Sequence, residues 1–147
     1  MKTKVIIIAI LSIFFINIHH SMAQNKEQSM KEEKNHNDKL VVVWTSGDAD
    51  VAKKMVYMYT YNAKKNGWWK EITFIIWGPS SKLLAEDTEL QDYLAKMKDE
   101  GIVLEACKAC ADMYDVSDKL IDLGVDVKYM GTALTDYIKG NEHVITF

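Results

Sequence analysis

The sequence contains no arginine, a single proline and only two cysteines among its 147 residues. Without arginine, the chain cannot form the planar bidentate bonds with which guanidinium groups hold phosphates and carboxylates. Its 18 basic residues, all lysine, are outnumbered by 21 acidic residues, which gives a net charge of −3. Because nucleic-acid binding depends on clustered basic side chains, this charge balance argues against a nucleic-acid partner.

Common cofactor and metal motifs are also missing. The sequence has no glycine-rich phosphate loop of either common type and no carboxylate cluster with metal-ligand spacing. A zinc site built on Cys107 and Cys110 would need two further ligands, and the folded part offers only His143. A c-type haem site would need histidine after the second cysteine, where Ala111 stands. We therefore expect neither a metal ion nor another cofactor.

The first residues have the composition of an export signal. Two lysines within the first four residues precede an apolar run over residues 5–18, and small residues follow at Ser21 and Ala23. This pattern predicts a signal peptide over residues 1–23, cleaved after Ala23, and a secreted or periplasmic protein. The apolar run is shorter than the about 20 residues of a membrane span, so cleavage is favoured over an uncleaved anchor.

Residues 24–39 contain a single apolar residue, Met30, and cannot bury a core. We interpret them as a flexible polar leader, and we expect the folded domain to span residues 40–147. Removal of the signal peptide would leave 16 basic and 21 acidic residues, a net charge of about −5. We expect no membrane span in the mature protein.

Short apolar runs alternate with longer amphipathic runs from residue 40 onward. Runs typical of buried parallel strands cover residues 40–45, 71–77, 102–107, 125–130 and 143–147. Helical spacing covers residues 48–66, 87–100, 117–123 and 132–139, each followed by a glycine that fits the left-handed position past a helix end. The alternation predicts a three-layer α/β/α domain with a five-stranded parallel sheet.

This order brings four loops to the edge of the sheet at which open parallel sheets bind ligands. The loop after the third strand holds the two cysteines, with Lys108 between them. The candidate pocket residues in the four loops are Ser46, Gly47, Asp48, Gly78, Pro79, Ser80 and Lys108. Capping of the next helix is the more common role for Asp48, and the Gly78–Ser80 stretch equally fits a plain strand-to-helix turn.

The spacing of Cys107 and Cys110 favours redox or sulfur chemistry. Amides at a helix start, together with Lys108, would stabilise a thiolate, which is the reactive form of cysteine. A structural disulfide between the two would close a very small loop and would restrain the unfolded chain little. A pair of buried, unreactive thiols is the remaining structural alternative.

The whole domain resembles the DsrE/DsrF-like family of sulfur-relay proteins, which includes YchN-like and TusD-type proteins. Three features carry the resemblance: the order of strands and helices, the stretch LEACKACADMYDV at residues 104–116, and the tail LGVDVKYMGTALTDYIKGNEHVITF at residues 123–147. The resemblance implies the sheet order 4-3-2-1-5 and assembly into a homotrimer or homohexamer.

The resemblance further implies that a cysteine carries sulfur as a persulfide, received from or passed to a partner protein. The matching position is Cys107 or Cys110, and we expect Cys107 to carry the sulfur with Cys110 as the resolving thiol. An exported persulfide carrier or sulfurtransferase-like protein is therefore the leading hypothesis. A thiol–disulfide oxidoreductase and a non-catalytic oligomeric module that binds a small ligand or partner are the alternatives.

Overall fold

The computed structural model describes residues 22, 24, 26–28, 30, 38–140 and 142–147. The described residues between 22 and 30 are helical, whereas all of the predicted signal peptide except residue 22 and most of the predicted leader lie outside the described residues. One compact unit spans Asn37–Phe147. In the part of the chain that is described, no helix has the length and apolar character needed to cross a membrane.

Five parallel strands form one sheet in the order β4-β3-β2-β1-β5. The strands are β1 (Lys39–Trp44), β2 (Glu71–Ile76), β3 (Val103–Cys107), β4 (Asp126–Lys128) and β5 (His143–Thr146). Five of the six residues of β1 are buried, as expected for a strand that is covered on both faces. The predicted fold class and the strand order implied by the resemblance are both confirmed.

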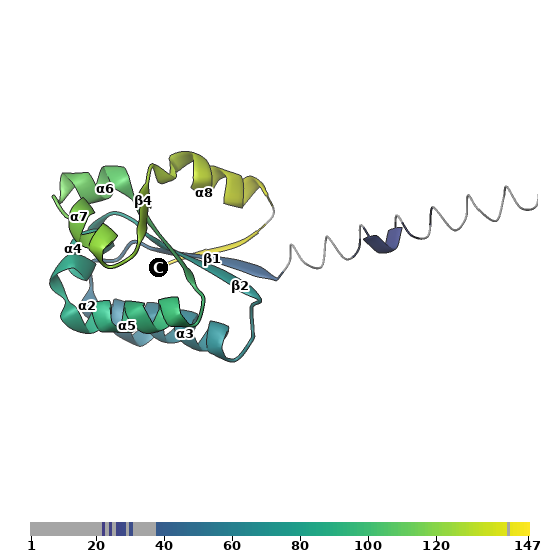
Figure 1. Ribbon diagram of the computed structural model, residues 1–147, viewed down its shortest axis with the longest axis horizontal. Coiled ribbons are helices and arrows are strands. Elements are labelled where there is room, and N and C mark those ends of the chain that lie inside the picture. The colour runs from purple at the N-terminus through teal and green to yellow at the C-terminus, as the bar shows by residue number, and fades with distance from the viewer. Residues whose placement is uncertain (1–21, 23, 25, 29, 31–37, 141) are drawn as a thin grey trace, which may run out of the picture. The chain divides into compact units, whose positions relative to one another are not determined.

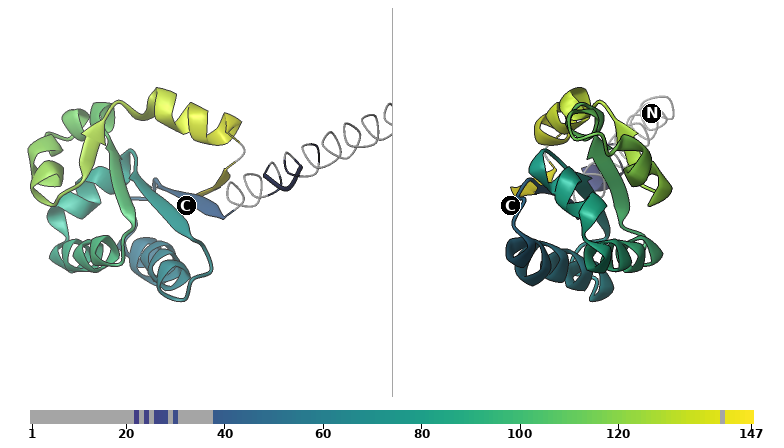
Figure 2. Two further views of the ribbon diagram at one scale, coloured as in Figure 1. Left: turned by 45° about the vertical axis from the view of Figure 1, so that its right-hand side comes forward. Right: turned by 90° about the vertical axis from the view of Figure 1, so that its left-hand side faces the viewer.

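Helices cover both faces of the sheet (Figures 1 and 2). One face carries a continuous run of α2 (Ala49–Val51), the π-helix η1 (Ala52–Tyr57) and α3 (Met58–Lys65), and beside it α5 (Thr88–Asp99). The other face carries α8 (Met130–Lys139). Three shorter helices, α4 (Pro79–Glu86), α6 (Lys108–Met113) and α7 (Ser117–Asp122), contact one another near the carboxyl ends of the strands.

Each face of the sheet has its own core. The larger core lies beneath η1, α3 and α5, and at its centre the rings of Trp44, Tyr57 and Phe74 pack with centroids 5.2–6.0 Å apart. The smaller core, beneath α8, joins strand residues such as Val43 to Cys107 and Met130. Cys107 therefore points toward the α8 side of the sheet.

Several local expectations need correction. Helix α4 was not predicted, and α6 was predicted only as a possible helix start at the cysteines, because α4 begins with Pro79 and two serines and both helices are too short to show a clear period. The glycines after three predicted helices have the expected positive φ, but Gly140 has φ −73° because the last turn of α8 ends there without a left-handed residue. Met55 and Met58 are both exposed, and the buried positions of the π-helix η1 are Ala52, Val56 and Tyr57.

Candidate functional site

The two cysteines lie at the carboxyl edge of the sheet. Cys107 ends β3 and is 4% exposed, whereas Cys110 lies in the first turn of α6 and is partly exposed. Both are free thiols, and their side chains are within hydrogen-bonding contact. Cys110 is therefore the more exposed residue of a pair whose thiols lie next to each other.

Opposing effects act on the Cys110 thiol. Burial raises its pKa, the hydrogen bond with Cys107 raises it further, and the Gly78 N–H, which donates to the sulfur, lowers it; the net result is a raised pKa. Gly78 has φ 71° and caps the start of α4, so a residue without a side chain presents this amide without steric strain. The amide directed at the sulfur therefore comes from the loop after β2, not from α6 as the sequence suggested.

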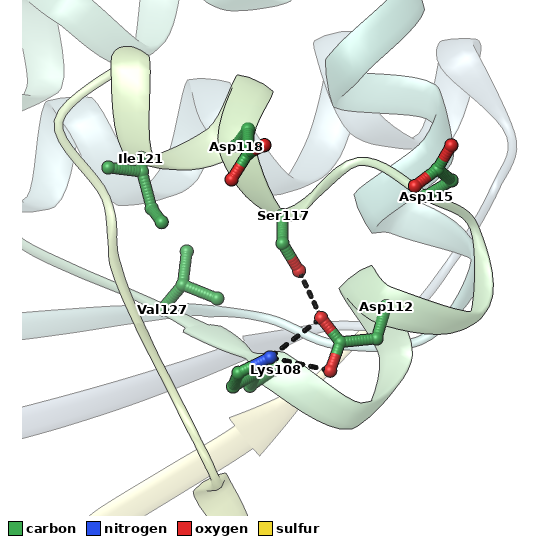
Figure 3. Close-up of a pocket in the computed structure, with 7 residues that line it drawn as sticks. All are labelled: Lys108, Asp112, Asp115, Ser117, Asp118, Ile121 and Val127. Atoms are coloured by element: carbon green, nitrogen blue, oxygen red, sulfur yellow. Dashed lines mark hydrogen bonds and ion pairs between the residues drawn. The ribbon is translucent and has the colours of Figure 1, made fainter.

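Lys108 does not add the expected positive charge beside the sulfurs. Its Nζ donates to both carboxylate oxygens of Asp112, at 2.8 and 2.6 Å, and Ser117 donates to the same carboxylate at 2.6 Å (Figure 3). These three residues line one side of a cavity of about 410 Å³, whose remaining wall is formed by Asp115, Asp118, Ile121 and Val127. The ammonium is therefore neutralised locally by Asp112.

The loops after β1 and β2 meet beside this edge, as predicted. Gly47 and Pro79 both line a second cavity, of about 280 Å³, together with Lys82, Leu83, Glu86 and Tyr114. A Cβ atom at position 47 would lie 3.2 Å from the Cβ of Pro79. Glycine at this position therefore permits the close approach of the two loops.

The other candidate residues have structural roles. The Asp48 side chain accepts from the backbone N–H groups of Asp50 and Val51, at 2.8 and 3.0 Å, and so caps α2. Ser46 accepts from the N–H of Asp48 at 3.1 Å. Ser80 is buried and bonded to the backbone at the ends of β1 and β2. Asp48 thus caps a helix, which was the structural alternative to a role in a binding pocket.

A buried carboxylate near the cysteines was not predicted from the sequence. Glu105, two residues before Cys107 on β3, is 4% exposed. Lys128 donates to it at 2.7 Å, and the Tyr137 hydroxyl lies 3.2 Å from both of its oxygens. The available signal was a single charged residue inside an otherwise apolar strand, which requires a partner when it is buried.

Within the described ranges, no group of three or more His, Cys, Asp or Glu side chains is arranged to hold a metal ion. The acidic side chains around the larger cavity are turned toward Lys108 and Ser117 or away from one another (Figure 3). The chemically distinctive groups near this edge are therefore the two thiols and the buried Glu105 carboxylate with its partners Lys128 and Tyr137.

Comparison with known proteins agrees with the fold. A conserved protein of unknown function, BT1422 from Bacteroides thetaiotaomicron, is 41% identical with a TM-score of 0.73, over 75% of this chain and 95% of that chain. The ychN protein from E. coli has the same fold at 14% identity and a TM-score of 0.59, over 76% of this chain and 99% of that chain. No curated protein matches this sequence.

The family comparison covers the folded domain as a whole. The model of the DsrE/DsrF-like family matches residues 38–147, a range that includes every strand of the sheet and both cysteines. Since this match takes in most of the chain and the strand order is the one that the resemblance implied, the chain belongs to the DsrE/DsrF-like family.

Proposed function

We propose that this protein carries sulfur as a persulfide on the pair formed by Cys107 and Cys110. The observation that supports this most directly is the contact between one solvent-reachable thiol and one buried thiol at the ligand-binding edge of a parallel sheet. Membership of the DsrE/DsrF-like family, whose relay members handle sulfur in this way, supports the same chemistry.

The more exposed sulfur is the better entry point for a donor. In the first step the Cys110 thiolate attacks the terminal sulfur of a donor persulfide R–S–SH. The donor S–S bond breaks, R–S⁻ leaves, and Cys110 becomes Cys110–S–SH. The Gly78 N–H stabilises the attacking thiolate because it already donates to this sulfur. This assignment exchanges the two roles expected from the sequence, because Cys107 is buried.

The buried thiol then has two possible reactions. Attack by the Cys107 thiolate on the terminal sulfur of Cys110–S–SH moves that sulfur inward and regenerates the Cys110 thiolate. Attack on the inner sulfur forms a Cys107–Cys110 disulfide and releases HS⁻, so that the sulfane sulfur is reduced as the two cysteines are oxidised. The first reaction stores sulfur, and the second delivers it.

Mass spectrometry tests the carrier function directly. The reduced chain is incubated with a polysulfide or a low-molecular-weight persulfide, and each cysteine peptide is examined for a gain of about 32 Da, the mass of one sulfur atom. We expect the adduct in the parent chain and in Cys107→Ser, and its loss in Cys110→Ser. Absence of any adduct on the parent chain, with both classes of donor, would remove the proposal.

A thiol–disulfide oxidoreductase is the second candidate, because the two sulfurs are already in contact. It predicts a reversible Cys107–Cys110 disulfide with a potential close to that of its compartment, and catalysed reduction of a protein disulfide such as that of insulin. A potential far below the compartment's would indicate a static bridge instead. Retention of the in vivo phenotype after replacement of both cysteines by serine would favour a non-catalytic binding module.

We also infer export and self-assembly. The basic start, apolar run and small residues at positions 21 and 23 support a signal peptide cleaved after Ala23. The family supports a homotrimer or homohexamer, with a sulfur donor or acceptor protein as a transient partner. N-terminal sequencing of the protein recovered outside the cytoplasm would test the cleavage site.

A further inference from the structure

The amide that reaches the Cys110 sulfur belongs to the peptide unit between Trp77 and Gly78. The Gly78 N–H donates to the sulfur, and Trp77 and Cys110 pack against the same smaller core. In a trans peptide unit the N–H and the C=O lie in one plane and point in opposite directions. The direction of the amide at the sulfur therefore depends on what holds the Trp77 carbonyl at the other side of that plane.

The buried Ser80 hydroxyl contacts both backbone groups of Trp77. Its Oγ accepts from the Trp77 N–H at 3.0 Å and lies 3.1 Å from the Trp77 carbonyl oxygen. It also donates to the carbonyl of Trp44, at the end of β1, at 2.7 Å. Its one proton is shared between the two carbonyl oxygens, while its oxygen accepts from the N–H. The hydroxyl therefore restrains residue 77 on both sides of its Cα atom and ties it to β1.

Gly78 itself gives the amide little restraint. It has φ 71° and ψ −134°, and a Cβ atom placed there would meet no atom within 4 Å. Glycine is the residue with the widest range of backbone conformations, so its amide takes the direction that its neighbours impose. The Ser81 N–H donates to the Gly78 carbonyl at 3.0 Å, but this bond acts on the following peptide unit. The restraint on the amide plane therefore comes from Ser80.

We propose that Ser80 is a positioning residue for sulfur transfer, which holds the Trp77–Gly78 peptide so that its N–H points at the Cys110 sulfur. This inference rests on the proposed function, because the anion that the amide stabilises is the thiolate that attacks the donor, or the persulfide that results. Ser80 acts through the peptide unit that it holds, in addition to joining the ends of β1 and β2.

Few ionisable groups act on the Cys110 thiol. Its pKa is raised by burial first and then by Cys107, and it is lowered by the Gly78 amide. Lys108 on α6 and Tyr137 on α8 are each bonded to a carboxylate of their own. Serine carries no charge, so replacement of Ser80 by alanine changes none of these charges. A shift in the ionisation of Cys110 in that variant would therefore report the position of the amide.

The test is the ionisation of Cys110 in the full-length chain with Cys107→Ser, in which Cys110 is the only thiol, followed by the ultraviolet absorbance of the thiolate. We expect Ser80→Ala to raise the midpoint pH by about half a unit to one unit, or roughly three- to tenfold less thiolate below the midpoint. Ser81→Ala is the matched control and should leave the midpoint unchanged, because the Ser81 hydroxyl is equally buried but has no partner among the described residues.

The Gly78 amide gives a second measurement, which a purely structural role of Ser80 would not change. In the ¹⁵N-labelled Cys107→Ser chain, the Gly78 amide resonance should follow the Cys110 titration, and Ser80→Ala should remove most of that response. The amide of Gly67, past the end of α3, is the reference and should not respond. The measurement without a substitution at Ser80 tests the amide contact even where Ser80→Ala folds poorly.

Three results would overturn the proposal. They are a midpoint in Ser80→Ala that is no higher than in the chain with Ser80 intact, an equal rise in Ser81→Ala, and a Gly78 resonance that ignores the titration. A raised midpoint in Ser80→Ala of a chain that accepts no sulfur would support this positioning role while removing the carrier function. An unchanged midpoint in a chain that accepts sulfur would remove the role of Ser80 and leave the carrier function in place.

Discussion

Two neighbouring serines in the first turn of α4 are equally buried but are bonded differently. Ser80 donates to the carbonyl of Trp44 at 2.7 Å and accepts from the N–H of Trp77 at 3.0 Å. The Ser81 hydroxyl is also buried but has no hydrogen-bond partner among the described residues. Burial alone therefore does not tell which serine contributes more to stability, because the contribution of a buried hydroxyl depends on its hydrogen-bond partners.

Ser80→Ala should lower the free energy of unfolding by about 1 kcal/mol, because it removes the hydrogen bonds of the hydroxyl to the Trp44 carbonyl and the Trp77 N–H, which then keep only their bond to each other at 3.0 Å. Ser81→Ala should be neutral or slightly stabilising, since it removes an unpaired hydroxyl. Urea unfolding of both variants measures the difference. An equal cost for the two substitutions would contradict this interpretation.

Individual residues of the site differ in how far their positions could be predicted from the sequence. The position of the cysteine pair and of the loops that hold Gly47 and Pro79 was predictable, because every strand of a parallel sheet ends at the same edge. The direction of the Lys108 side chain depends on Asp112 four residues later, on a helix whose extent was not predicted. The role of Glu105 depends on Lys128 and Tyr137, which only the folded sheet brings together.

Helix α5 shows how one side chain defines the start of an element. The Asp87 carboxylate accepts from the N–H of Leu90 at 3.1 Å and from Lys53 at 2.9 Å. The hydrogen bond from Lys53 is the largest cause of a lowered pKa at Asp87, and the Leu90 N–H contributes next. The cap thus joins α5 to the π-helical segment that carries Lys53.

Asp87→Ala should lower the free energy of unfolding by about 1 kcal/mol at neutral pH. Because the pKa is lowered by folding, this contribution is complete above the unfolded value near pH 4 and is lost as the pH falls through the folded value. Unfolding curves of parent and variant should therefore converge in acid. Asp92→Ala, an exposed position in the same helix, is the control and should change little.

Substitutions at two glycines separate the effect of backbone conformation from the effect of packing. No atom lies within 4 Å of a Cβ placed at Gly67 or at Gly131, but Gly67 has φ 67° past the end of α3 and Gly131 lies in the first turn of α8. Gly67→Ala should cost about 1 kcal/mol of unfolding free energy, whereas Gly131→Ala should stabilise by roughly 0.5–1 kcal/mol. Thermal unfolding distinguishes them, and a loss of stability in Gly131→Ala would contradict the argument.

At the scale of the whole molecule, alternation of apolar and amphipathic runs was sufficient to predict a parallel sheet but not its order. Any apolar run of this kind can pair with any other, so the order β4-β3-β2-β1-β5 was expected only from the resemblance to the family. Helix α4 and the extent of α6 escaped prediction because both helices are short and weakly periodic. Helix α6 carries Cys110, and α4 begins directly after Gly78, whose amide reaches that sulfur.

The surface leads to a prediction about assembly. Val51, Met55 and Met58 are 38–51% exposed along one stretch of α2, η1 and α3, and Trp68 follows at 57%. Apolar side chains that recur along one segment are typical of contact surfaces. Light scattering of the purified chain should give the mass of a trimer or hexamer, and Met55→Lys combined with Met58→Lys should reduce it. A monomer at micromolar concentration would contradict the assembly.

The contact between Gly47 and Pro79 has an evolutionary consequence. A methyl group at position 47 would press on Pro79, the residue after the amide that reaches Cys110, although position 47 itself touches neither sulfur. The domain would tolerate alanine there, because Gly47 and Pro79 are both exposed and the sheet is unaffected. Natural selection for glycine at position 47 would therefore act on the acidity of the Cys110 thiol more than on the stability of the fold.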